Sequence, residues 1–246
     1  MKNFISIEDL SDFEKSISEA IALKNNSLKF NSLGENKSLG MLFFNPSLRT
    51  RLSTQKAAQN LGLNTMVMNF NDEGWKLEFQ NGVEMNGSSS EHVKEAASVI
   101  SQYCDIIAIR AFASLNDKEA DESELVINSF CKYSSVPIIN MESATAHPLQ
   151  ALADAITIEE HKKINRPKVV LTWAPHPKPL PHAVANSFVK MIKKIDVDFV
   201  ITRPEGYSLN SKIESQINST TDQEEAFKNA DFVYAKNWCS YKNYGK

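Results

Sequence analysis

The sequence predicts an α/β protein built from two doubly wound parallel-sheet domains with a cleft between them. Short apolar segments alternate with amphipathic segments in spacings of about 25–35 residues, which is typical of strand–helix–strand units. Polar residues directly follow most of the apolar segments, and open parallel sheets bind ligands beyond the carboxyl ends of their strands. The run 165–167 (Asn-Arg-Pro) interrupts this pattern, so we expect one domain over residues 1–163 and a second over 164–246.

The composition is that of an ordinary globular protein. Of the 246 residues, 42% are hydrophobic and 23% are charged. The formal net charge of −3 argues against a nucleic-acid or membrane surface, and no apolar run approaches the ~18 residues that cross a bilayer. The three cysteines are far apart and odd in number, which favours the reducing cytoplasm. Residues 1–9 reach acids before any apolar core builds up, so we expect no signal peptide.

The first elements follow from apolar spacing. Helical periodicity predicts a helix over 7–28, and a continuous apolar run predicts a strand over 39–44. Pro46 ends this strand, because proline has no N–H for the ladder. Ser47 is a good N-cap, so we expect it to open a helix over 50–61.

Glycines and further apolar runs define the next elements. Gly62 is expected to end the second helix as its C-cap, and a strand follows over 64–70. Residues 71–90 contain three glycines and little periodicity, so this long segment is expected to be a functional or mobile loop. An apolar face predicts a helix over 91–103, and a buried strand follows over 105–109.

The same criteria give the remaining elements. A helix over 119–133, a strand over 136–140 and a helix over 147–161, with Pro148 in its first turn, complete the first domain. The elements expected after it are a strand over 168–173, a loop with four prolines over 174–181, a helix over 182–194, a strand over 196–202, a helix over 222–229 and a strand over 230–235.

The turn after the first strand has the composition of an anion site. Free backbone N–H groups and the positive end of the helix dipole meet there, beside the hydroxyls of Ser47 and Thr50 and the guanidiniums of Arg49 and Arg51. This set suits a phosphate, although a serine cap followed by solvated arginines is the ordinary alternative. The two arginines lie roughly 200° apart around a helix. We therefore expect one of them to bind the anion and the other to hold structure or a neighbouring chain.

Further polar candidates follow other strands: Arg110, Glu142, His147, His176 and Lys236. Each alone has an ordinary alternative, such as a surface arginine, a helix cap or a solvated acid. Their shared position at strand ends is what favours a function. Trp75 lies in a polar, glycine-flanked loop with nothing of its own to pack on, which favours contact with a partner or a ligand.

Three motifs resemble those of one enzyme family in order and spacing. Residues 47–51 (Ser-Leu-Arg-Thr-Arg) resemble the Ser-Thr-Arg-Thr-Arg carbamoyl-phosphate motif of the aspartate/ornithine transcarbamylases, with leucine in the second position. Residues 147–150 (His-Pro-Leu-Gln) resemble the family's His-Pro-x-Gln motif, and Arg110 ends the strand where the family keeps a ligand arginine. The resemblance covers essentially the whole chain.

Two loops resemble the branch that acts on N-acylated ornithines. Asp72-Glu73-Gly74-Trp75 stands where other branches have a short polar motif, and Trp75 looks like the tryptophan that reaches into a neighbouring subunit's site. Residues 173–180 resemble the same branch's proline-rich loop. Ser90 stands before Glu91 in a loop where acetyl-specific enzymes carry a glutamate. Its neutrality relieves a repulsion of about 1–4 kcal/mol on a succinyl carboxylate, so we favour the succinyl substrate.

The resemblance implies a cytoplasmic carbamoyltransferase of arginine biosynthesis that requires no cofactor and no metal. It would move the carbamoyl group of carbamoyl phosphate to the δ-amine of N-succinyl-L-ornithine, with N-acetylornithine as the alternative acceptor. The residues implied to bind carbamoyl phosphate are Ser47, Leu48, Arg49, Thr50, Trp75, Arg110, His147 and Gln150. Among these, Arg110, His147 and Thr50 would be catalytic, because they polarise the carbamoyl oxygen. Glu142, His176, Lys236 and Ser90 would bind the amino acid.

The resemblance also implies how the chain is organised. The domain over 1–163 would bind carbamoyl phosphate and that over 164–246 the amino acid, and Trp75 would act across subunits of a homotrimer. Family chains continue past residue 246, so we expect the second domain to be C-terminally incomplete. Two other classes remain open: a catalytically silent binding relative, and a dinucleotide-dependent dehydrogenase. The dehydrogenase is disfavoured because no Gly-x-Gly occurs in the sequence.

Overall fold

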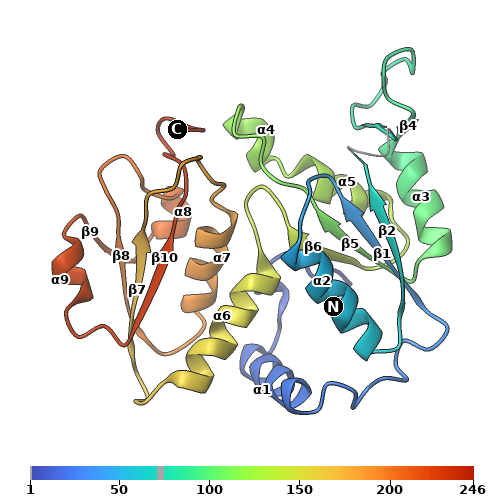
Figure 1. Ribbon diagram of the computed structural model, residues 1–246. Helices are drawn as coiled ribbons and strands as arrows, with labels where there is room; N and C mark the ends of the chain where they lie inside the picture. Colours follow the sequence, from blue (N-terminus) through green and yellow to red (C-terminus); the bar gives the residue numbers. More distant parts are fainter. Residues whose placement is uncertain (1, 71–74) are drawn as a thin grey trace. The chain divides into compact units, whose positions relative to one another are not determined.

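The computed structural model describes residues 2–70 and 75–246 and divides the chain into two compact units (Figure 1). The first unit comprises Met1–Phe112 and Ser123–Ser143, and the second comprises Ala113–Glu122 and Ala144–Lys246. Each unit contains a four-stranded parallel sheet, which confirms the predicted α/β class. The expected division into a carbamoyl-phosphate-binding domain over 1–163 and an amino-acid-binding domain over 164–246 stays a prediction.

The sheet of the first unit has the order β2-β1-β5-β6. Its strands are β1 (Ser38–Phe43), β2 (Asn64–Asn69), β5 (Ile106–Arg110) and β6 (Ile138–Glu142). Helix α2 (Arg49–Asn60) lies on one face, whereas α3 (Val93–Tyr103) and α5 (Leu125–Tyr133) lie on the other (Figure 1). The chain moves from β1 to β2 toward one edge of the sheet, and then from β2 through β5 to β6 toward the other edge. Because each crossover is right-handed, the helix of the first connection lies on the opposite face from the helices of the later ones.

Apolar residues of β1 and β5 form the core beneath α3 and α5. Leu42, Ile107 and Ile109 are fully buried there, together with Val93 and Phe130 from the two helices. The runs of buried residues along β1 and β5 explain why both strands could be predicted, since a strand covered on two faces has no polar alternation.

The predicted glycine stop after α2 is confirmed, although the C-cap is Leu61 and Gly62 lies one position beyond it. Gly62 has a φ of 78°, and its N–H donates to Gln59 O at 3.0 Å while Leu63 N donates to Ala58 O at 2.9 Å. This pair of bonds is a Schellman motif. A Cβ at Gly62 would lie 2.0 Å from Asn31 O, so only glycine fits.

The predicted N-terminal helix over 7–28 is wrong at both ends. A short 3₁₀ turn occupies Ile7–Asp9, and α1 spans only Phe13–Asn25. Asp12 caps α1 by accepting a hydrogen bond from Lys15 N at 2.9 Å. The helix begins there because a capping carboxylate satisfies one of the N–H groups of the first turn.

The predicted helix over 119–133 is two helices, α4 (Lys118–Glu122) and α5. Glu124 lies between them with a φ of 51°, a left-handed conformation that interrupts helical hydrogen bonding. In addition, the Asp121 carboxylate accepts hydrogen bonds from Ser114 N at 2.8 Å and Leu115 N at 2.9 Å. These bonds hold α4 to the turn that precedes it, within the second unit.

The long segment 71–90 is less irregular than expected in its described part. The two-residue strand β3 (Leu77–Glu78) pairs in parallel with β4 (Glu91–His92). Helix α3 therefore starts two residues later than predicted, and His92 caps it through Nδ1, which accepts from Lys94 N at 3.1 Å.

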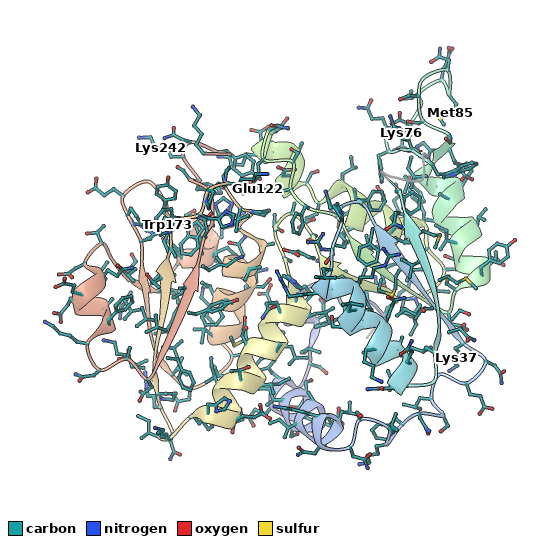
Figure 2. All side chains as sticks on the ribbon, viewed as in Figure 1. Lys37, Lys76, Met85, Glu122, Trp173 and Lys242 are labelled. Atoms are coloured by element: carbon teal, nitrogen blue, oxygen red, sulfur yellow. The ribbon has the colours of Figure 1, made fainter. Side chains whose placement is uncertain are left out.

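The second unit contains the sheet β10-β7-β8-β9. Its elements are α6 (Pro148–His161), β7 (Lys168–Trp173), α7 (Ala183–Ile192), β8 (Asp198–Thr202), α8 (Ser211–Glu214), β9 (Asn218–Thr220), α9 (Gln223–Phe227) and β10 (Phe232–Lys236). Both α8 and β9 were missed by the sequence patterns, because they are short and mostly polar. Figure 2 shows the side chain of Trp173 at the end of β7, where its indole donates to Trp238 O at 2.9 Å.

Three further features bear on function. Within residues 2–70 and 75–246, no helix combines the length and apolarity needed to cross a membrane. The same residues hold no group of three or more histidine, cysteine or acidic side chains placed to share a metal ion. Cys104, Cys131 and Cys239 are free thiols.

Candidate functional site

The sheet of the first unit brings three candidate segments to one edge. Phe43, the last residue of β1, pairs with Arg110, the last residue of β5. A register shift between β5 and β6 then places Arg110 opposite Glu142. Because the strands are parallel, the turn after β1, Arg110 and Glu142 all lie at the carboxyl edge, as predicted.

The helix after β1 begins without a side-chain cap, so the prediction that Ser47 caps it is wrong. Leu48 occupies the N-cap position in a right-handed helical conformation, and no described side chain caps it. A serine two positions before the first helical residue cannot reach the N–H groups that a cap satisfies. The first-turn N–H groups are therefore directed at whatever occupies the adjacent space, and this arrangement suits an anion.

A hollow of about 470 Å³ adjoins this helix start. It is lined by Phe43, Pro46, Ser47, Leu48, Arg51 and Asn69. The Arg51 guanidinium lies 5.8 Å from the centre of the Phe43 ring, whereas Arg49 is exposed. The two arginines thus differ in surroundings, and the predicted assignment of Arg49 to the anion stays a prediction.

Arg110 connects the segments at this edge. Its Nη1 donates to Pro46 O at 2.8 Å, and its Nη2 donates to the Glu142 carboxylate at 3.2 Å. The guanidinium also lies 3.9 Å from the centre of the Phe112 ring. Only 7% of Arg110 and 8% of Glu142 are exposed, so this ion pair is shielded from water.

Burial sets the electrostatics of Arg110. It lowers the pKa of the guanidinium, and the Glu142 carboxylate opposes that shift. The Nε atom of Arg110 is buried without a hydrogen-bond partner among the described residues. The guanidinium therefore holds the turn after β1 in place and retains an unused donor.

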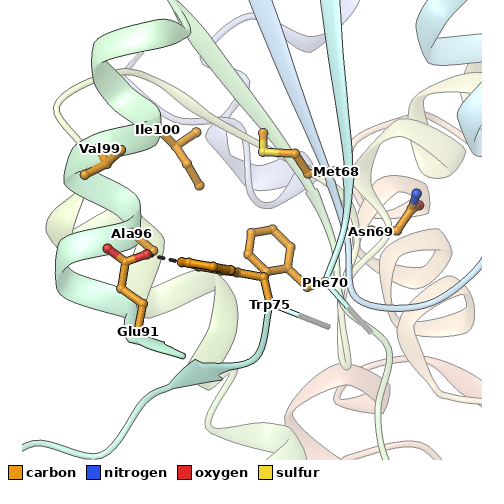
Figure 3. Close-up of a pocket in the computed structure, with 8 residues that line it drawn as sticks. All are labelled: Met68, Asn69, Phe70, Trp75, Glu91, Ala96, Val99 and Ile100. Atoms are coloured by element: carbon orange, nitrogen blue, oxygen red, sulfur yellow. Dashed lines mark hydrogen bonds between the residues drawn. The ribbon is translucent and has the colours of Figure 1, made fainter. Parts of the chain in front are cut away.

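Trp75 contacts its own chain through Glu91. The indole Nε1 donates to the Glu91 carboxylate at 3.1 Å, and the ring borders an apolar hollow of about 310 Å³ over α3 (Figure 3). The tryptophan is nevertheless 52% exposed. A contact with a second subunit stays a prediction, and Asp72-Glu73-Gly74 lie outside the described residues.

Ser90 precedes Glu91 and is exposed. Its N–H donates to Lys76 O at 2.8 Å, which fixes its backbone beside β3. The adjacent Glu91 carboxylate is engaged by Trp75. The two neighbours thus present different chemistry, a neutral hydroxyl at one position and a hydrogen-bonded carboxylate at the next.

In the second unit, α6 carries His147 and Gln150. His147 caps the helix, and its Nδ1 accepts from Gln150 N at 3.4 Å. Its own N–H donates to Ser187 Oγ at 2.7 Å, which fixes the residue against α7. Because Nδ1 acts as an acceptor, the proton of the neutral ring is on Nε2.

His176 and Lys236 lie at adjacent strand ends of the same unit. Lys236 pairs with Trp173, and Ala174 N donates to Lys236 O at 3.0 Å. His176 follows in the proline-rich loop, where its Nδ1 lies 2.7 Å from Lys178 O. Both candidates follow the carboxyl ends of neighbouring parallel strands, so their segments lie at the same edge of the sheet, where such sheets bind ligands.

Sequence reasoning missed the carboxyl group that contacts Gln150. Gln150 Nε2 donates to Asp154 Oδ1 at 2.8 Å, one helical turn along α6. Burial raises the pKa of Asp154 to about 6, against hydrogen bonds from Gln150 and Tyr234. The spacing i, i+4 is visible in the sequence, but it only becomes informative once Gln150 is assigned to a site.

Replacing Asp154 with asparagine should change the free energy of unfolding in a pH-dependent way. Compared with the unchanged chain, the variant should be favoured more at neutral pH than at pH 4. The native carboxyl holds its proton up to about pH 6, whereas the unfolded carboxyl releases it near pH 4, so stability falls as pH rises through this window. Between pH 4 and pH 8 the variant should gain about 2–3 kcal/mol on the unchanged chain in urea unfolding. Equal pH profiles would contradict this.

Comparisons with known proteins place the chain among transferases. Residues 2–160 match the aspartate/ornithine carbamoyltransferase, carbamoyl-P binding domain. The chain is 52% identical to the N-succinylornithine carbamoyltransferase of Bacteroides thetaiotaomicron, over all of this chain and 78% of that protein. It is 36% identical to the N-acetylornithine carbamoyltransferase of Xanthomonas axonopodis pv. citri, over all of this chain and 76% of the relative.

Solved structures agree with this similarity. A glutamate-to-serine variant of N-acetyl-L-ornithine transcarbamylase, complexed with carbamyl phosphate and N-succinyl-L-norvaline, superposes with a TM-score of 0.93 at 35% identity. The match covers all of this chain and 78% of that structure. The unsubstituted N-acetyl-L-ornithine transcarbamylase matches with a TM-score of 0.90 over the same shares.

Proposed function

This chain belongs to the aspartate/ornithine carbamoyltransferase family, and from that premise we propose that it carbamoylates the δ-amine of N-succinyl-L-ornithine. Carbamoyl phosphate would be the donor, and the products would be N-succinyl-L-citrulline and phosphate, within arginine biosynthesis. The observation that carries this proposal is the 52% identity to an N-succinylornithine carbamoyltransferase over the whole chain. Identity to the N-acetylornithine enzymes is lower, at 36%.

The phosphate end of carbamoyl phosphate would be bound at the start of α2. Ser47, the Leu48 N–H, Arg49 and Thr50 would hold it, and the uncapped helix start beside a hollow of about 470 Å³ supports this role. Hydrogen bonds from backbone N–H groups and a guanidinium suit a phosphate that gains charge as it leaves.

The carbamoyl end would be polarised by Arg110, His147 and Thr50. Attack of the neutral δ-amine on the carbamoyl carbon forms a C–N bond and moves an electron pair onto the carbonyl oxygen, where these donors would stabilise it. The C–O bond to phosphate then breaks, and the departing phosphate takes the amine proton. The Nε donor of Arg110, which has no partner among the described residues, supports this assignment.

The amino acid would be bound by Glu142, His176, Lys236 and Ser90. A carboxylate such as Glu142 can accept from the amide N–H that acylation creates, whereas the lysine and histidine suit the substrate's carboxylates. Trp75 would complete the phosphate site of a neighbouring subunit in a cytoplasmic homotrimer. Its 52% exposure supports such a contact, because a tryptophan at an interface is buried by its partner.

Ser90 provides the test of substrate choice. Replacing it with glutamate should reverse the preference, because a new carboxylate near a succinyl carboxylate costs about 1–4 kcal/mol. The ratio of kcat/KM for N-succinylornithine to that for N-acetylornithine should fall by about tenfold or more. Ser90→Gln is the matched control, since it adds the same bulk without charge and should shift the ratio far less. An unchanged ratio in Ser90→Glu would refute the role of this position.

A further inference from the structure

Asp154 fixes which way the side-chain amide of Gln150 points. An ionised carboxylate only accepts hydrogen bonds, so the 2.8 Å contact requires the NH₂ group of Gln150 to face Asp154 Oδ1. The amide oxygen Oε1 then points away from Asp154 and is available as an acceptor. The side chain of Gln150 therefore has one defined orientation rather than two.

The carboxyl group itself is in an unfavourable position for stability. Its Oδ2 atom is buried without a hydrogen-bond partner among the described residues. Burial of a carboxylate with an unsatisfied oxygen costs free energy, and an apolar residue would pack there without that cost. A functional role therefore explains this carboxyl group better than a contribution to the stability of the fold does.

A second element supports the same carboxyl group. Tyr234 on β10 lies close enough to Asp154 for the two groups to shift each other's pKa, and its ring packs on Phe188 of α7 with ring centres 4.5 Å apart. Burial and the neighbouring carboxylate both raise the pKa of Tyr234, so the phenol keeps its proton. Within the described residues, Gln150 on α6 and Tyr234 on β10 are the groups that act on the pKa of Asp154. Gln150 thus contacts Asp154 directly, and Tyr234 lies beside it on a second element.

We propose that Asp154 is a positioning residue that orients Gln150 Oε1 to accept a hydrogen bond from the NH₂ group of carbamoyl phosphate. This inference rests on the proposed function, because it takes Gln150 to contact that substrate. Phosphate offers no amide donor, so the contact distinguishes the carbamoyl end from the phosphate end. Loss of Asp154 should therefore weaken binding of the carbamoyl group and leave binding of phosphate unchanged.

The binding test uses two probes on the full chain: phosphonoacetamide, which keeps the carbamoyl NH₂, and inorganic phosphate, which has none. Asp154→Leu should raise the Kd of phosphonoacetamide by about tenfold, the value of one well-placed hydrogen bond, with the Kd of phosphate within twofold. Asp154→Asn, whose amide oxygen can still accept from Gln150, should recover most of the loss. The exposed Glu159→Gln on the same helix is the control and should change neither value. Equal weakening of both probes in Asp154→Leu would overturn the proposal.

A second measurement follows Gln150 itself in the folded chain. The side-chain amide resonances of Gln150 in the unchanged chain, assigned by their loss in Gln150→Leu, should titrate with a midpoint near pH 6, the pKa of Asp154. The titration should vanish in Asp154→Asn, and its midpoint should move upward in Tyr234→Phe, which removes a donor that favours the ionised carboxyl. An amide that does not titrate would overturn the inference. A chain whose Gln150 amide titrates but which carbamoylates no ornithine would refute the proposed function alone.

Discussion

Replacing Arg49 with alanine should lower kcat/KM for carbamoyl phosphate by about 10²–10³-fold, the scale seen when one donor to a developing anion is removed. The expectation rests on the uncapped start of α2, where a guanidinium beside free N–H groups is favourable only if an anion compensates its charge. Arg49 is exposed, so its loss should leave the unfolding temperature within about 2 °C. Steady-state kinetics and thermal unfolding measure the two effects.

Lys56 offers the matched control for this experiment. It is also an exposed cation on α2, but it lies beyond the first turn and cannot reach an anion at the helix start. Lys56→Ala should leave kcat/KM within twofold. If Arg49→Ala also keeps turnover within a few-fold, the assignment of Arg49 to the phosphate fails, and Arg51, which lines the hollow, becomes the alternative.

Replacing Arg110 with methionine should abolish measurable turnover and also cost about 3–5 kcal/mol of folding free energy. The large cost follows from leaving the buried Glu142 carboxylate without its cation. Loss of the hydrogen bond to Pro46 O adds to it, because the turn after β1 is no longer held. Urea unfolding at neutral pH measures the cost.

The double variant Arg110→Met with Glu142→Gln separates the two roles of Arg110. Removing the carboxylate that the first change strands should restore part of the folding free energy, about 1–3 kcal/mol, because a neutral amide is cheaper to bury than an unpaired charge. Turnover should stay absent. A double variant no more stable than Arg110→Met would contradict the role of the ion pair, and recovered turnover would contradict the catalytic role.

All strands of the two four-stranded sheets except β9 could be predicted, because each of them coincides with an apolar run in the sequence. Residues 168–173 were predicted as a strand to the residue, and β7 is buried along most of its length. Helix boundaries were harder, because they depend on single caps. Asp12 caps α1 and Leu48 opens α2 without a cap, although Ser47 has the better propensity. The short polar β9 has no apolar pattern, and pairing with β8 alone defines it.

The position of polar residues after strand ends identified candidate site residues in each sheet, but it did not reveal which side chains contact one another. It predicted that Arg110 and Glu142 would lie at one edge, and the ion pair between them depends on a register shift that no local pattern reveals. The same holds for Trp75 and Glu91, and for Tyr234, which meets Asp154 from a distant strand. Tertiary contacts of this kind follow from how elements pack, which propensity does not encode.

The most direct test of the proposed function is kcat/KM measured side by side for ornithine, N-acetylornithine and N-succinylornithine, with carbamoyl phosphate as donor. The neutral Ser90 and the 52% identity to an N-succinylornithine carbamoyltransferase predict the highest kcat/KM for N-succinylornithine. We expect it to exceed the other two values by tenfold or more, which corresponds to a difference of about 1.4 kcal/mol or more in activation free energy. A higher value for ornithine or N-acetylornithine, or no transfer to any of the three, would contradict it.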